Sequence, residues 1–195
     1  MEKYGMPDIN WKWANSHMDN QGFWANVSFR DDLSEDFIRQ YADQLNWYNL
    51  SKNEAVTFSE EFAEEFKDKI WWKGLSRRNL DEKFIERFKD YVDWKAISFK
   101  KYLSDDFIDK HANYIDWFML CKYRQVSEDF IEKFAGRVDW NEVSRNQRIS
   151  VDFIKKHWNQ VNLFLVSLNY KVPYYWRTKW QKQYNDRYKK DFGKY

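Results

Sequence analysis

Few side chains in this sequence have the chemistry of a catalytic or metal site. Cys121 is the single cysteine, and a thiolate can act as a nucleophile. His111 and His157 carry imidazoles suited to metal binding or general-base catalysis. Neighbouring carboxylates, such as Glu128 and Asp129, are the residue type that glycoside hydrolases use in pairs. The position of each group within the chain's internal repeat indicates whether it does chemistry.

A phrase of about 23 residues recurs along the chain, which indicates a repeat architecture. "LSEDFIRQYADQLNW" at residues 33–47 returns as "VSEDFIEKFAGRVDW" at 126–140. A Phe anchors each copy, and Trp follows it by ten residues in every copy except the last, which has Leu. The six anchors are Phe37, Phe62, Phe84, Phe107, Phe130 and Phe153.

Within each copy the apolar residues have helical spacing: Phe, then Ile or Ala, an aromatic four after the Phe and an aliphatic residue eight after it. Ser or Asp three before the anchor, and Asn or Asp before the Trp, predict two helix N-caps per copy. We therefore predict a helix of about three turns, a corner and a helix of one or two turns. The predicted N-caps are Ser34, Ser59, Asp81, Ser104, Ser127 and Ser150 for the first helix, and Asn46, Asp93, Asp116, Asp139 and Asn162 for the second.

The predicted fold is all-α. Residues 33–170 form a short α-solenoid of about six two-helix repeats, residues 1–32 an atypical N-terminal capping unit, and residues 171–195 a basic, aromatic C-terminal capping helix. Only five Gly and two Pro leave little room for hairpins. The last segment has an aromatic every four residues, at Trp176, Trp180, Tyr184, Tyr188 and Phe192.

The repeat assigns structural roles to the reactive side chains. Cys121 takes a position that is Ser in the other copies, and both histidines take the aromatic position four after the anchor. Acid pairs stand at most helix starts, where they complement the helix dipole. The chain has no Gly-rich phosphate loop and no G-x-S-x-G. We therefore predict a non-enzymatic protein with no catalytic residue, metal site or cofactor.

Basic residues follow the second helix of each repeat, and stacking would align them as a basic ridge. One interpretation is that cations simply favour helix C-termini. The other is a surface for an acidic protein or a phosphate backbone. The ridge comprises Arg30, Lys52, Arg77, Arg78, Lys100, Lys101, Lys122, Arg124, Arg145 and Arg148, with Phe29, Phe99, Tyr102, Tyr123 and Tyr170 among them.

The C-terminal segment is also basic, with eight cations and two acids in residues 171–195. Its aromatic stripe is expected to cap the last repeat. Cations with interleaved aromatics also suit single-stranded nucleic acid or a membrane surface. The candidate binding residues here are Arg177, Lys182, Arg187, Lys189 and Lys190.

The assembled phrase "LSEDFI…DW…IS" resembles short tandem repeats in uncharacterised proteins of large DNA viruses and bacteriophages. The resemblance implies a viral origin and a host protein, such as a defence factor, as partner. Binding of a protein partner is the predicted function, and nucleic-acid binding through the ridge and C-terminal helix is the alternative. A lone cysteine, no apolar run near the roughly 18 residues of a membrane span, and a polar N-terminus predict a cytoplasmic location, in the host if viral.

Overall fold

The computed structural model describes residues 21–192, and the side chains of residues 21–186. This part of the chain is entirely helical, with fourteen helices and no strand, which confirms the predicted helical repeat fold. The chain divides into two compact units, Met1–Asp93 (unit 1) and Trp94–Tyr195 (unit 2).

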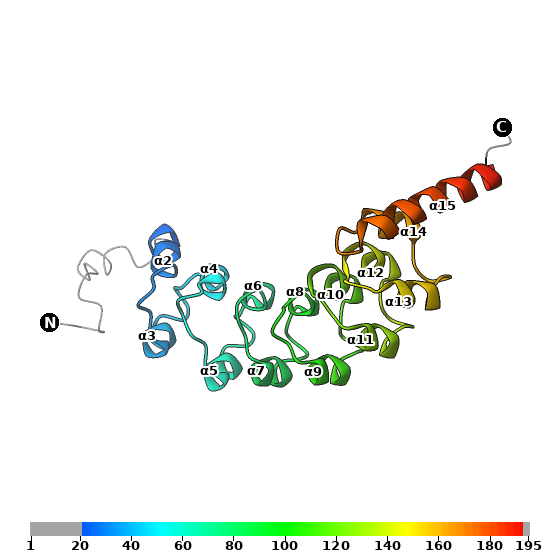
Figure 1. Ribbon diagram of the computed structural model, residues 1–195. Helices are drawn as coiled ribbons and strands as arrows, with labels where there is room; N and C mark the ends of the chain where they lie inside the picture. The colour runs from blue at the N-terminus through cyan, green and yellow to red at the C-terminus, as the bar shows by residue number, and fades with distance from the viewer. Residues whose placement is uncertain (1–20, 193–195) are drawn as a thin grey trace. The chain divides into compact units, whose positions relative to one another are not determined.

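Each repeat contributes one helix to each of two rows. Within each unit the even-numbered helices up to α14 form an even row, and the odd-numbered helices up to α13 form an odd row (Figure 1). Unit 1 contains α2 (Gln21–Val27), α3 (Glu35–Gln40), α4 (Trp47–Lys52), α5 (Glu60–Glu65), α6 (Trp72–Leu75) and α7 (Glu82–Arg87). Unit 2 contains α8 (Trp94–Ser98), α9 (Asp105–Lys110), α10 (Trp117–Tyr123), α11 (Glu128–Lys133), α12 (Trp140–Asn146), α13 (Val151–Lys156), α14 (Leu163–Leu168) and α15 (Tyr174–Phe192).

The odd-row helices begin where the sequence predicts. In all six, the side chain of the predicted N-cap accepts a hydrogen bond from the backbone N–H of the anchor Phe. Their predicted length is wrong, because each has six residues and ends before the aromatic position four after the anchor. That residue leaves helical geometry, as Phe134 does with φ −110° and ψ 26°. A turn follows, and it returns the aliphatic residue, here Val138, to the core.

Four of the predicted even-row N-caps are confirmed: Asn46, Asp116, Asp139 and Asn162. α6 departs from the pattern, since Trp71 precedes it and makes no side-chain capping bond. The Trp71 ring instead lies over Gly74, where an added Cβ would be 2.2 Å from Cε3 of the ring. It also contacts Tyr48, with ring centroids 4.2 Å apart. Gly74 is therefore required by close packing.

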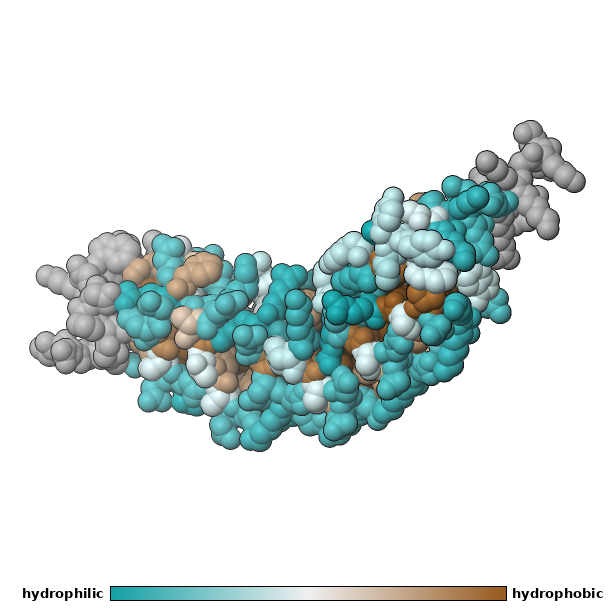
Figure 2. All heavy atoms as spheres, viewed as in Figure 1, coloured by the Kyte–Doolittle hydropathy of each residue, from teal (hydrophilic) through white to brown (hydrophobic). Residues whose placement is uncertain are grey.

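Aromatic contacts join successive repeats. The Trp that opens an even-row helix packs on the aromatic side chain four after the next anchor, as Trp117 does on Phe134 with centroids 4.9 Å apart. The indole N–H donates to the carbonyl five residues earlier, which fixes the ring; Trp47 Nε1 lies 2.7 Å from Ala42 O. In each unit hydrophobic residues show between the two rows, while hydrophilic residues cover most of the odd row (Figure 2).

A buried hydroxyl near the end of the even-row helix also links repeats. Ser98 Oγ donates to Trp94 O at 2.6 Å and accepts from the backbone N–H of Asp116, the N-cap of the next even-row helix, at 2.8 Å. Ser28, Ser51 and Ser144 make the same two bonds. The small residue of this position therefore hydrogen-bonds as well as packs.

α15 packs against α14 at the end of unit 2. Trp180 is buried, and the rings of Phe164 and Tyr184 lie 5.3 Å apart. This part of the aromatic stripe covers the last repeat. The side chains of Tyr188 and Phe192 lie outside the described residues.

Candidate binding surface

The reactive side chains occupy the structural positions that the repeat predicts. Cys121 is fully buried and hydrogen-bonds the backbone N–H of Asp139, as the serines do at its position. Burial raises the pKa of its thiol to about 11, so the thiol is protonated at neutral pH. His111 and His157 pack under Trp94 and Trp140, with ring centroids 5.2 and 5.1 Å apart. All three side chains serve packing between repeats.

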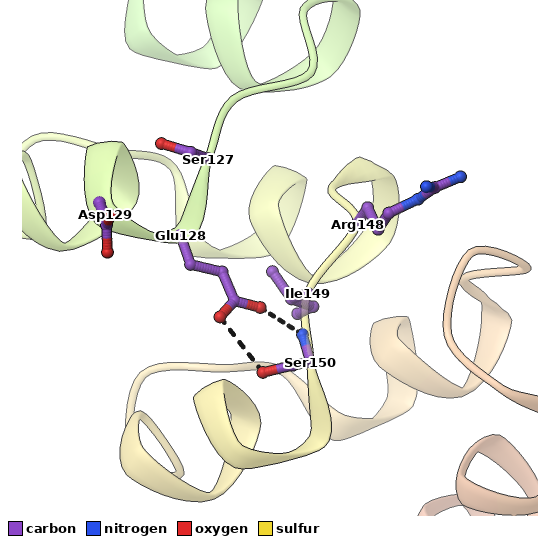
Figure 3. Close-up of a pocket in the computed structure, with 6 residues that line it drawn as sticks. All are labelled: Ser127, Glu128, Asp129, Arg148, Ile149 and Ser150. Carbon is purple, nitrogen blue, oxygen red and sulfur yellow. Dashed lines mark hydrogen bonds between the residues drawn. The ribbon is translucent and has the colours of Figure 1, made fainter.

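The carboxylate pairs divide between two surroundings. Glu35 accepts a hydrogen bond at 2.7 Å from the backbone N–H of Ser59, the N-cap of the next odd-row helix. Glu128 turns toward Ser150 in the same way and binds its N–H and its hydroxyl (Figure 3). The second acid of each pair, Asp36 or Asp129, is exposed. Among residues 21–186 no group of three His, Cys, Asp or Glu side chains could hold a metal ion.

Part of the predicted basic ridge is structural. Arg78 is buried, which lowers the pKa of its guanidinium, and it donates to Val56 O of the preceding repeat. Arg124 likewise donates to Leu103 O, and it also pairs with Asp105 at 2.6 Å. Lys100 is buried as well. Arg78 and Arg124 therefore link adjacent repeats.

The same position is neutral in other repeats, which the sequence analysis did not recognise. Asn53, Gln147 and Asn169 each donate to two backbone carbonyls of the preceding repeat. The sequence contains a pattern that could have predicted this role. Every repeat has a side chain with N–H donors two or three residues after the buried Ser or Cys. Such donors satisfy carbonyls that stacking removes from water.

The other ridge residues face outward. Lys52, Arg77, Lys101, Lys122, Arg145 and Arg148 are exposed, whereas Arg30 is half-buried and pairs with Asp32. Exposed rings accompany them, and Lys122 lies over both Phe118 and Tyr123 with its Nζ 5.2 Å from each centroid. Rings at the second residue of an even-row helix, in Tyr48, Phe118 and Phe164, were also missed by the sequence analysis. The sequence pattern that could have predicted them is an aromatic residue directly after the Trp of the repeat, or after Leu163 in the last repeat.

In unit 2 the two rows differ in charge. The even-row helices and following loops, residues 94–103, 117–126, 140–149 and 163–172, carry eight basic side chains and one acid, the buried Glu142. The odd-row segments between them, residues 104–116, 127–139 and 150–162, carry nine acids and five basic side chains. Charge is therefore separated by row.

The cations of the two rows also differ in their partners. Odd-row Lys133 pairs with Asp109 at 3.1 Å, and Lys156 pairs with Glu132 at 2.7 Å, each in the preceding repeat. By contrast, the side-chain nitrogens of Lys101, Arg145 and Arg148 have no ion-pair or hydrogen-bond partner among the described residues. The even row thus presents uncompensated positive charge.

The loops after α10, α12 and α14 lie side by side, and Arg148 belongs to the second of them. Gln125 Nε2 donates to Asn146 O at 2.8 Å, and its Oε1 accepts from the backbone N–H of Arg148 at 3.2 Å. Lys171, in the loop after α14, donates to the same Asn146 carbonyl. The loops after α10, α12 and α14 therefore form one surface.

The C-terminal candidates are only partly described. Arg177 is half-buried over the ring of Tyr174, at 5.6 Å, and Lys182 is exposed. Arg187, Lys189 and Lys190 lie outside the residues whose side chains the structure describes. Within residues 21–192 no helix is both long and apolar enough to cross a membrane.

Comparison of the chain with models of protein families, with curated protein sequences and with solved structures finds no match.

Proposed function

We propose that this chain is a non-enzymatic repeat scaffold that binds an acidic region of a protein partner through the even row of unit 2. The surface proposed to bind, called the even-row face below, consists of exposed cations and rings on α10, α12 and α14 and in the loops after α8, α12 and α14. Its residues are Lys101, Tyr102, Phe118, Lys122, Tyr123, Arg145, Arg148, Phe164 and Tyr170.

The observation that carries the proposal is the contrast in ion pairing between the rows. Odd-row Lys133, Lys155 and Lys156 are paired with carboxylates of the preceding repeat or of their own helix, and Arg137 donates to a backbone carbonyl. Lys101, Arg145 and Arg148 have no such carboxylate among the described residues. A surface of one sign with no internal counterion attracts a partner of the opposite sign.

The exposed rings favour a protein partner. Tyr102, Phe118, Tyr123 and Phe164 are 39–47% exposed, and Tyr170 is 79% exposed. Tyr, Phe and Arg side chains are enriched in protein interfaces. α-Solenoids commonly use such extended surfaces for protein recognition.

The proposal also covers the origin of the protein and the place where it acts. The resemblance of the repeat phrase to those of DNA viruses and bacteriophages supports a host protein as partner, such as a defence factor. The chain would then act in the host cytoplasm.

Affinity capture with three baits tests the proposal: wild type, Lys101→Gln/Lys122→Gln/Arg145→Gln, and the charge-matched control Lys133→Gln/Arg137→Gln/Lys155→Gln. We expect one acidic protein to be recovered by wild type and by the control and to be lost from the even-row variant. Equal recovery by all three baits contradicts the proposal.

Nucleic-acid binding is the second candidate, and the cation–ring contacts favour it. Lys122 over Phe118 and Tyr123, and Lys171 over Tyr170, combine charge with exposed stacking surfaces. Mobility shift with single- and double-stranded DNA and RNA at two salt concentrations is the test. Salt-sensitive binding that the even-row variant loses would favour nucleic acid over a protein partner.

A further inference from the structure

One place beside the even-row face is hollowed into an open cavity. It has a volume of about 490 Å³ and is lined by Gln125, Val126, Ser127, Arg148 and Lys171. The loops after α10, α12 and α14 contribute its walls, and the hydrogen bonds to Asn146 O hold those loops together. The cavity is therefore built by adjacent repeats.

Two cations line this cavity without a carboxylate. The guanidinium of Arg148 has no hydrogen-bond or ion-pair partner among the described residues. Burial first, and then the charge of Arg148, lower the pKa of Lys171. The two cations thus destabilise one another, and an anion between them would relieve that cost.

The nearby acids do not supply that anion. Glu128 and Asp129 line a neighbouring cavity of about 500 Å³ that shares Ser127 and Arg148. Glu128 is turned to Ser150, and Arg148 extends away from both acids (Figure 3). The charge of Arg148 therefore remains open to an external group.

The remaining polar groups define what the cavity can bind. Both ends of the Gln125 amide are engaged, with Asn146 O and with the backbone N–H of Arg148. Ser127 Oγ accepts from Phe130 N at 3.1 Å, which leaves its O–H able to donate. Arg148 and Lys171 offer donors only, which suits an oxyanion, whereas the Ser127 hydroxyl points away from Arg148 (Figure 3).

One of the loops that line the cavity already holds a carboxylate on an arginine. Arg124, in the loop after α10, binds the carboxylate of Asp105 at 2.6 Å. Exposed rings flank the cavity loops, with Tyr123 before Gln125 and Tyr170 before Lys171. An acidic residue with apolar neighbours complements this arrangement.

We propose that the Arg148–Lys171 cavity is an anion subsite that receives an Asp or Glu side chain from an extended acidic segment of a protein partner. This assignment rests on the proposed function of the even-row face and names the chemistry that the face recognises. Arg148 forms a forked pair with the carboxylate, and Lys171 supplies a second positive charge beside it.

The test measures binding of a labelled peptide that alternates Glu with Leu and Tyr, by fluorescence anisotropy. Arg148→Gln is the main variant, because its exposed side chain supports no other described residue. We expect it to weaken peptide binding about tenfold, a loss of about 1.4 kcal/mol, with an unchanged unfolding curve. A peptide with Gln in place of Glu should bind the wild-type protein no more tightly than the Glu peptide binds Arg148→Gln. Arg148→Lys should restore only part of the affinity, since it keeps the charge but loses the fork.

Several results would overturn the assignment, and they separate it from the proposed function. If Arg148→Gln binds like wild type while Lys101→Gln/Lys122→Gln/Arg145→Gln loses binding, the subsite is wrong and the face stands. If neither variant changes binding, or if the wild-type protein does not bind the peptide, then both the subsite and the even-row face are wrong as binding sites for acidic segments. If a phosphoserine peptide or a single-stranded oligonucleotide binds through Arg148 and the Glu peptide does not, the carboxylate assignment is overturned.

Discussion

Single positions in this chain carry the contacts that join one repeat to the next. Ser98, near the end of α8, illustrates this, because its hydroxyl satisfies a backbone carbonyl of its own helix and the backbone N–H of the next even-row N-cap. Cys121 takes this position once and keeps the bond to the next N-cap. What a position needs here is a small side chain that can accept a hydrogen bond.

This requirement predicts the outcome of two substitutions at Ser98. Ser98→Ala leaves the backbone N–H of Asp116 without its acceptor in a buried setting, so we expect unfolding free energy to fall by about 1–3 kcal/mol. Ser98→Cys should cost much less, because Cys121 fills the same position elsewhere. Urea denaturation followed by circular dichroism measures both. Equal losses in the two variants would show that the hydrogen bond is unimportant.

The helices are short, and their ends account for much of their stability. A six-residue helix is too short to persist alone in water. Each odd-row helix therefore depends on its N-cap and on the aromatic packing of its buried face, and in α3 and α11 an acid also binds the N-cap residue of the next odd-row helix. Ion pairs between neighbouring odd-row helices supplement these contacts.

The ion pairs predict a pH dependence at Glu132. Hydrogen bonds from Lys156, and then from His157, lower the pKa of this carboxyl below its ordinary value. A lowered folded-state pKa adds stability above the unfolded-state pKa of about 4.3, and this is lost as pH falls through the folded-state value. We therefore expect Glu132→Gln to be less stable than wild type at neutral pH and the difference to vanish toward pH values below both pKa values.

Urea midpoints measured across this pH range check the prediction. Asp129→Asn is the matched control, because Asp129 is exposed and pairs with no cation among the described residues. A constant difference between wild type and Glu132→Gln at every pH would contradict the electrostatic explanation.

α15 makes a separate prediction about capping. Trp180 is 3% exposed, so Trp180→Ala should lower the unfolding free energy by roughly 3–5 kcal/mol. Lys182→Ala changes an exposed residue of the same helix and should stay within about 0.5 kcal/mol of wild type. If Trp180→Ala unfolds like Lys182→Ala, α15 does not stabilise the last repeat.

At the scale of the whole molecule, the sequence pattern predicts the class of fold and misses much of the surface chemistry. Fixed offsets of Ser, Phe and Trp predict the helix starts, because capping and aromatic packing are local or nearest-neighbour effects. Helix length is not predicted, since the helical spacing of the apolar residues continues through the turn after Phe134. Arg78 and Arg124 illustrate the limit for the ridge, because a cation that binds a distant carbonyl has the same local sequence as one in solvent.

The separation of charge by row is the property of unit 2 from which the proposed function follows. The basic residues after the second helix and the acids at the start of the first helix can be read from the sequence. The pairing of odd-row cations with neighbouring acids is seen only in the structure. Pairing removes one set of cations from recognition and leaves the even-row set available. The even-row face is therefore the expected site of binding for any acidic partner.

Titration with poly-L-glutamate at low and high salt tests this claim most directly, because it requires no identified partner. We predict that wild type and Lys133→Gln/Arg137→Gln/Lys155→Gln bind alike at low salt and lose affinity at high salt. Lys101→Gln/Lys122→Gln/Arg145→Gln should bind about tenfold more weakly, although its net charge equals that of the control. Equal weakening in the two triple variants would show that net charge alone drives binding, and would contradict a binding face on the even row.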